Sequence, residues 1–127
     1  MTELKPKYRG TKEYLLVYAE LINAARCRGT VTYQEVAEIM GLPLSGSHMG
    51  AETGYMLGEI SAEEVSHGRP MLSAIAVNTR GVPGPGFIPW AERLGRYKGS
   101  SKESEKKFWK EEEEAIYETW RKKLKSK

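Results

Sequence analysis

The stretch GTVTYQEVAEIMGLP, residues 29–43, constrains the fold more than any other part of the chain, because it carries the signals for both ends of one short helix. Thr32 and Glu35 have the spacing of a capping box, in which each side chain satisfies a free backbone N–H at the helix start. Gly41, with a proline two residues later, stops the helix, since glycine adopts the left-handed conformation that ends helices. We therefore predict a helix over residues 33–40, preceded by a short strand or turn.

A second helix is predicted directly after the first, so that the two form a helix-turn-helix. Ser45 or Ser47 can cap it, because a serine oxygen accepts a hydrogen bond from a free N–H, and we expect it to end near Ile60. One of its faces carries three glycines that fall four residues apart: Gly50, Gly54 and Gly58. Glycine destabilises a helix interior by up to about 1 kcal/mol per position. Something therefore lies close to this face, either a neighbouring helix or the backbone of a nucleic acid.

The segments around this pair have simpler patterns. A helix over about residues 12–27, capped by Thr11, is predicted to bury an apolar face. The residues at three- and four-residue steps on that face are Tyr14, Leu15, Tyr18, Leu21, Ile22 and Ala25. Residues 61–70 are predicted to form a turn or a short helix with Ser61 as its cap, and residues 71–77 a buried strand.

A loop rich in glycine and proline follows at residues 78–87, and a short helix is predicted after Pro89. Beyond a polar break, the C-terminal segment is predicted to form an amphipathic helix. Its apolar side, which we call the tryptophan face, carries Trp109, Ile116 and Trp120. We therefore divide the chain into a winged-helix-like domain, residues 1–98, and residues 99–127, the polar break with the C-terminal helix. The predicted fold class is mainly α with a small β element.

The composition limits the classes of function. The chain has 127 residues and one cysteine, Cys27, which excludes an internal disulfide and a multi-cysteine zinc site. It has no aspartate, which weakens the case for a metal-dependent nuclease, and we assign no metal site and no cofactor. No apolar run reaches the roughly 20 residues that a membrane span needs, and the start lacks the pattern of a signal peptide. We therefore expect a cytoplasmic protein without membrane contact. Abundant Lys and Glu with few amides is a bias of thermophilic proteins.

A helix-turn-helix binds DNA when the N-terminus of its second helix is exposed, carries small residues and lies beside positive charge. Ser45, Ser47 and His48 provide such an N-terminus and are candidates for groove contacts. The candidates for phosphate contacts are Arg26, Arg28, Arg69, Arg80 and Tyr33. The formal net charge of +3 is too small to identify a partner by itself.

The order of these segments resembles the C-terminal DNA-binding domain of the O6-alkylguanine DNA alkyltransferases and alkyltransferase-like proteins. The apolar helix YLLVYAELINAARCRG and the segment GTVTYQEVA occur in the family's order, and the similarity covers about residues 12–95. The resemblance implies a winged-helix domain that binds double-stranded DNA. It also implies that Tyr33 contacts a phosphate beside a rotated nucleotide, and it places Ser47 at the family's intercalating arginine.

The resemblance does not carry the family's chemistry to this chain. The reactive cysteine of the family falls on Met71 when the segments are aligned on Pro70, and on Ser73 when they are aligned on residues 77–81. Neither residue is a thiol, and a serine hydroxyl is a poor nucleophile without an adjacent base. Met71 and Ser73 are therefore pocket candidates, and no catalytic residue is assigned. Cys27 lies in another segment and is expected to be structural.

Three functions stay open at this point. The first, which the sequence favours, is a non-catalytic protein that binds double-stranded DNA. The second is a protein-interaction module, in which the tryptophan face holds a partner or a second copy of the chain. The third is an enzyme that uses Ser73 with His48 or His67, which requires hydrogen-bond contact between the serine and a histidine.

Overall fold

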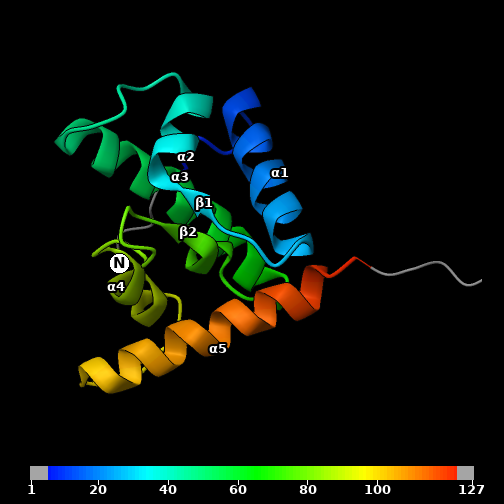
Figure 1. The fold of residues 1–127 in the computed structure, drawn as a ribbon, viewed down its shortest axis with the longest axis vertical. Helices are drawn as coiled ribbons and strands as arrows, with labels where there is room; N and C mark the ends of the chain where they lie inside the picture. Colours follow the sequence, from blue (N-terminus) through cyan, green and yellow to red (C-terminus); the bar gives the residue numbers. More distant parts are fainter. Residues whose placement is uncertain (1–5, 123–127) are drawn as a thin grey trace, which may run out of the picture.

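The computed structural model of the 127-residue chain describes residues 6–122. The fold is mainly helical with a small two-stranded parallel sheet, as predicted from the sequence (Figure 1). The elements in chain order are α1 (Lys12–Arg26), β1 (Val31–Thr32), α2 (Tyr33–Met40), α3 (Ser47–Ser66), the 3-10 turn η1 (Leu72–Ile75), β2 (Ala76–Val77), α4 (Phe87–Arg93) and α5 (Lys102–Trp120). Within residues 6–122, none of the helices has the length and apolar character that crossing a membrane requires.

Helix α1 begins where predicted, because the Thr11 side chain accepts a hydrogen bond from the N–H of Tyr14 at 3.1 Å. At three- and four-residue steps, its buried face carries Tyr14, Val17, Leu21 and Ala25. Leu15 was expected on this face, and that prediction is wrong: the residue is 65% exposed. Neighbouring residues of a helix point about 100° apart, so a chain that buries Tyr14 turns Leu15 toward solvent.

Helix α2 has both of its predicted end signals. The Thr32 side chain accepts the N–H of Glu35, and the Glu35 carboxylate accepts the N–H of Thr32. Gly41 has a φ of +74°, the left-handed conformation that glycine adopts without steric cost. Val36 and Ala37 are buried, and α2 packs against both α1 and α3.

Helix α3 is longer than predicted, since it continues beyond Ile60 to Ser66, and Gly68, with a φ of +74°, terminates it. The N–H of Arg69 donates to the carbonyl of Glu64 at 2.9 Å, which is the closing bond of a Schellman motif. The prediction of a separate turn or helix capped by Ser61 is therefore wrong. Ser61 lies inside α3 and is fully buried, where its hydroxyl has a partner in the core.

The predicted strand over residues 71–77 is only partly a strand. Its first part forms η1, and only Ala76 and Val77 pair with β1, in parallel. The whole stretch is buried, as predicted. The ladder is short because β1 has two residues before the capping box starts α2. This pairing places Tyr33, the first residue of α2, beside the loop that follows β2.

Helix α4 was predicted to begin after Pro89, but it begins two residues earlier, at Phe87. Pro89 is the third residue of the helix. The N–H groups of a first helical turn have no partner within the helix, so a proline there removes no hydrogen bond. Phe87 and Ala91 are buried, which attaches α4 to the core.

Helix α5 crosses one side of the domain and shares its core (Figure 1). It begins at Lys102, within the predicted polar break, because Ser101 caps it. On the tryptophan face, Ile116 is fully buried, and Trp109 and Trp120 pack partly buried against the core. The face is therefore occupied by the chain's own domain, and the predicted boundary between residues 98 and 99 does not separate two cores. Residues 1–5 and 123–127, which the predicted divisions include, lie outside the described residues.

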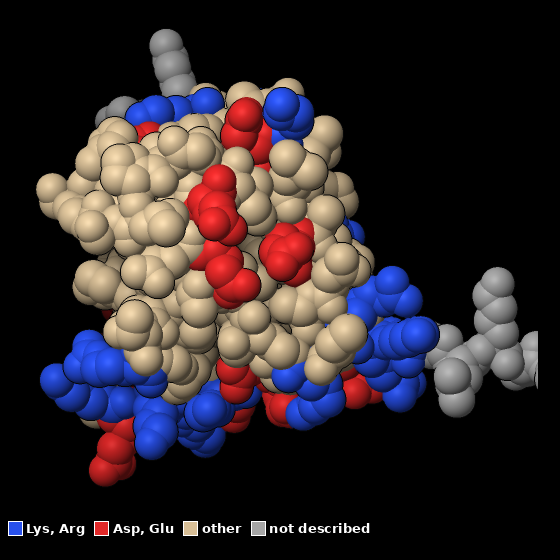
Figure 2. All heavy atoms as spheres, turned by 45° about the horizontal axis from the view of Figure 1, so that its top comes forward, with Lys and Arg blue, Asp and Glu red and all other residues tan. Residues whose placement is uncertain are grey.

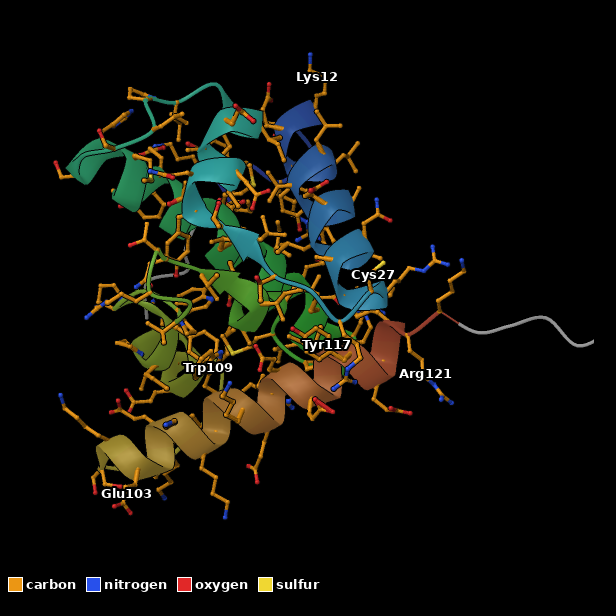
Figure 3. The ribbon with its side chains drawn as sticks, in the orientation of Figure 1. Lys12, Cys27, Glu103, Trp109, Tyr117 and Arg121 are labelled. Atoms are coloured by element: carbon orange, nitrogen blue, oxygen red, sulfur yellow. The ribbon has the colours of Figure 1, made fainter. Side chains whose placement is uncertain are left out.

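Two long-range hydrogen bonds attach α5 to the domain, on the side that carries Trp109 and Tyr117 in Figure 3. The indole N–H of Trp109 donates to the carbonyl of Ala74 at 2.9 Å. The Tyr117 hydroxyl donates to the carbonyl of Gly29, also at 2.9 Å. Both carbonyls belong to irregular or 3-10 segments that lack a regular ladder, so α5 satisfies backbone groups that would otherwise need another partner.

A buried carboxylate adds a third attachment. Glu112 accepts the N–H of Met71 at 2.9 Å and two N–H groups of Arg96 at 2.6 and 3.0 Å. The Glu112 side chain is only 4% exposed. A charge so far from water is tolerated because these donors replace its hydration.

Candidate nucleic-acid interface

A cleft of about 1360 Å³ opens along α3. One wall is the row of three glycines on that helix. No heavy atom lies within 4 Å of the position that a Cβ would take at Gly50 or Gly54, whereas ring atoms of Trp90 lie 3.4 Å from the corresponding position at Gly58. The two explanations for the glycine row therefore apply to different residues. Gly58 permits close packing of a neighbouring helix, and Gly50 and Gly54 leave one wall of the cleft open.

Aromatic rings form much of the remaining wall. They are Tyr33 from α2, Tyr55 from α3, and Phe87 and Trp90 from α4. The indole N–H of Trp90 donates to the Gly58 carbonyl at 2.9 Å, which fixes the ring against α3. Rings around an open cleft can stack on a flat group, and every nucleobase presents such a face.

Tyr33 is held in place by the loop after β2. Its hydroxyl oxygen accepts the N–H of Gly84. A Cβ at Gly84 would lie 2.9 Å from that oxygen, so only glycine allows the backbone to approach this closely. Burial raises the pKa of Tyr33, and the Gly84 N–H opposes the change. The hydroxyl therefore stays protonated near neutral pH and keeps a hydrogen that it can donate.

A pair of serines connects the cleft to the core, with Ser73 in the cleft lining and Ser61 fully buried behind it. The Ser61 hydroxyl donates to the Ser73 oxygen at 2.8 Å and accepts the Ser73 N–H at 3.1 Å. Ser73 lines the cleft, whereas Met71 is fully buried and is not part of its lining. Of the two pocket candidates, Ser73 alone borders the cleft.

Within residues 6–122, Ser73 forms no pair with a histidine, and the one serine–histidine contact is that of Ser66 with the neighbouring His67 at 3.2 Å. The only side-chain partner of Ser73 in this range is Ser61. The His67 ring instead lies 2.9 Å from the Glu63 carbonyl, and His48 is exposed at the start of α3. Without a base beside it, the Ser73 hydroxyl lacks the activation that nucleophilic catalysis requires.

The predicted groove contacts occur together at the start of α3. Ser45, Ser47 and His48 are exposed, and Ser47 lines the cleft. The first turn of α3 has no acidic residue, so the positive end of the helix dipole is unopposed there. Arg80 is exposed in the loop after β2, two residues beyond Asn78, which also lines the cleft.

The other predicted phosphate contacts lie elsewhere. Arg28 pairs with Glu114 of α5 at 2.7 Å, and Arg69 pairs with Glu64 at 2.6 Å beside the Trp120 ring. Figure 3 shows the end of α1, marked by Cys27, beside the Tyr117 part of α5. Arg26 belongs to this last turn of α1 and is exposed. The structure therefore does not bring Arg26, Arg28 and Arg69 to the cleft.

An N-terminal strap, residues 6–9, forms the rest of the rim and was missed by sequence reasoning. Pro6, Lys7 and Arg9 line the cleft next to Glu59 and Glu63 of α3. The sequence holds a partial signal: three glutamates, Glu52, Glu59 and Glu63, recur at helical spacing and so share one face. Nothing in that spacing shows which cations pair with them.

Figure 2 shows how the charges are distributed on one face of the molecule. Lys and Arg gather in two groups along the lower edge, which is the side of α5 in Figure 1, and smaller groups lie at the upper edge. Glutamates form a group in the middle, and much of the upper left is uncharged. A polyanion would therefore find only local positive charge on this face.

Among residues 6–122, no group of three or more His, Cys, Asp or Glu side chains is placed to hold a metal ion. Cys27 is exposed at the end of α1 and is not part of the cleft. No family model, no curated protein and no solved structure matches the chain.

Proposed function

We propose that the chain is a non-catalytic protein that binds duplex DNA through the helix-turn-helix of α2 and α3, as its resemblance to the alkyltransferase-like domains implies. The observation that carries the proposal is the position of the cleft. It opens beside the N-terminus of α3, and Tyr33 and Ser47, at the starts of the two helices, both line it.

The start of α3 is the part that enters the duplex in this proposal. Ser45, Ser47 and His48 are exposed donors there, and the helix dipole favours approach of a phosphate. Arg80 supplies a cation from the neighbouring loop. Phosphate contacts of this kind fix the register of a protein on DNA, and the small side chains permit a close approach.

The cleft supports a further part of the proposal, a site for one unstacked base. Proteins that extrude a base hold it between aromatic or apolar side chains. Here Tyr33 and Trp90 provide rings, Gly50 and Gly54 leave space, and Ser73 places a hydroxyl at the floor. Because Ser73 has no base beside it, we propose recognition of the base without covalent transfer.

Fluorescence anisotropy with labelled duplex DNA, at about 50 and about 200 mM salt, tests the proposal. Ser47→Glu is the informative variant, because a carboxylate at a helix N-terminus stabilises the fold while repelling phosphate. We expect at least about a tenfold loss of affinity. The matched control is Ser100→Glu, which adds the same charge at an exposed residue outside the cleft. Absence of wild-type binding to any duplex at low salt contradicts the proposal.

The structure gives less support to the protein-interaction alternative. Ile116 is fully buried against the domain, and Trp109 already donates its indole N–H to Ala74. A partner that used the tryptophan face would have to displace α5 from the core. Light scattering that shows a dimer of the intact chain would revive this alternative.

A further inference from the structure

The strap, residues 6–9, is attached to α3 by one carboxylate. Glu59 accepts three consecutive backbone N–H groups: that of Lys7 at 2.8 Å, that of Tyr8 at 3.0 Å and that of Arg9 at 2.9 Å. Three such bonds to one charged acceptor fix the path of the backbone, because each is stronger than a bond between neutral groups. Glu59 therefore determines where the strap side chains lie.

The side chains of the strap pair with the other glutamates on the same face of α3; we call Glu52, Glu59 and Glu63 the glutamate stripe. The Lys7 ammonium lies 2.7 Å from Glu52, and the Arg9 guanidinium lies 2.9 Å from Glu63. The Tyr8 hydroxyl donates to Glu52. The hydrogen bonds from Lys7 and Tyr8 lower the pKa of Glu52, so this carboxyl is ionised near neutral pH and keeps its attraction for Lys7.

Lys7 and Arg9 keep donors that these pairs do not use. Their side chains are 53% and 60% exposed, and both residues line the cleft. An ammonium has three donors and a guanidinium five, whereas each makes one close contact with a carboxylate. The remaining donors face solvent at the rim, where a phosphate beside the cleft would pass.

Without the strap, the glutamate stripe would repel a polyanion rather than attract it. Glu52, Glu59 and Glu63 place three negative charges on one face of α3, two of them in the cleft lining, and the strap brings two positive charges to them. If the strap detached from α3, these three carboxylates would no longer be paired with cations. They would then repel a polyanion at the cleft, because like charges at close range repel.

We propose that Lys7 and Arg9 are phosphate-contacting residues of the cleft, and that Glu59 is the positioning residue that holds them at its rim. This inference rests on the proposed DNA binding and adds a contact site outside the helix-turn-helix. The inference predicts the direction in which DNA affinity changes when Glu59 is removed. Removing an acidic residue near bound DNA ordinarily strengthens binding. Removing Glu59 should weaken it, because the strap is then no longer held and its two cations leave the rim.

The test compares Glu59→Ala with Glu38→Ala in the full chain, using anisotropy with the same labelled duplex. Glu38 is exposed on α2 and lies outside the cleft lining. We expect at least about a fivefold loss of affinity for Glu59→Ala, and equal or tighter binding for Glu38→Ala. Lys7→Ala and Arg9→Ala each lower the slope of log affinity against log salt by about 1. In the Lys7→Ala/Arg9→Ala background, Glu59→Ala causes no further loss.

A second measurement, made without DNA, reports whether the strap is attached to α3. Trypsin cleaves after Lys7 and Arg9 when the strap is released, so we expect faster cleavage there in Glu59→Ala than in wild type. Unchanged cleavage overturns the assignment of Glu59 as the positioning residue. If wild type binds duplex and Glu59→Ala binds as tightly or more tightly, the strap inference is overturned and the proposed function stands. If wild type binds no duplex, both fall together.

Discussion

Tyr33 and Gly84 are 51 residues apart in the chain and lie in direct contact, with the N–H of Gly84 donating to the Tyr33 hydroxyl. Besides the 2.9 Å approach to the hydroxyl oxygen, a Cβ at Gly84 would meet two ring carbons of Tyr33 at 3.1 and 3.3 Å. The contact joins the first residue of α2 to the loop before α4. Both residues line the cleft, so its shape at this point depends on a residue without a side chain.

Gly84→Ala is therefore expected to destabilise the fold by about 1–3 kcal/mol, the usual cost of inserting a methyl group into a packed contact. Chemical denaturation measures the change in the free energy of unfolding. Gly86→Ala is the matched control, since no atom lies within 4 Å of its Cβ position. Equal effects of the two substitutions would contradict the close approach.

Gly54→Ala separates stability from binding. Its Cβ position is open, so alanine is expected to stabilise α3 by up to about 1 kcal/mol through its higher helix propensity. The same methyl group narrows the cleft, and we expect weaker DNA binding in the anisotropy titration. A variant that is more stable and binds DNA as tightly as wild type would show that the ligand does not approach Gly54.

Glu112→Ala tests the attachment of α5. The substitution leaves the Met71 N–H without an acceptor and the Arg96 guanidinium without its partner. We expect a loss of about 3 kcal/mol in the free energy of unfolding. Glu111→Ala, at the neighbouring exposed position, is expected to change stability by less than about 0.5 kcal/mol. Similar values for the two variants would mean that the buried carboxylate contributes nothing.

Alkaline pH is expected to weaken the fold through Tyr117. Burial, followed by the charge of Glu113, raises the pKa of Tyr117 from 10.0 to about 12. The folded state thus holds the phenol proton more tightly than the unfolded state does. The resulting stability is complete below pH 10 and is lost as the pH rises through about 12. The pKa of Tyr8 is also raised to about 12 and that of Tyr18 is raised too, so absorbance at the tyrosinate band should show a late ionisation of several tyrosines. Tyr117→Phe should lower its amplitude by one tyrosine, and an unchanged titration in that variant would contradict the assignment.

Local signals in the sequence were sufficient for the parts of the fold that depend on neighbouring residues. Thr32 and Glu35 form the predicted capping box because both partners lie within one helical turn. The same logic failed at Ser61, since a serine that faces the core has the same identity as one that caps a helix. Gly68, followed by a proline two residues later, was the better end signal for α3.

The candidate site was less predictable, because it depends on contacts between distant segments. Ser47 and Tyr33 were placed by the local order of two helices, and both line the cleft. Arg28 and Arg69 were selected for their charge alone, and each has an ion-pair partner that no sequence spacing reveals. Lys7 and Arg9 were missed because their partners lie about 50 residues further along the chain.

The bond between Tyr117 and the carbonyl of Gly29 spans 88 positions, and it has a consequence for how the protein is made. Helices α1 to α3 leave the ribosome before α5 does, because they precede it in the chain. Until α5 arrives, the apolar residues of η1 and the turn after α1 lack the surface that covers them. We expect nascent chains that stop before α5 to associate with chaperones, and the finished core to close only after α5 has emerged.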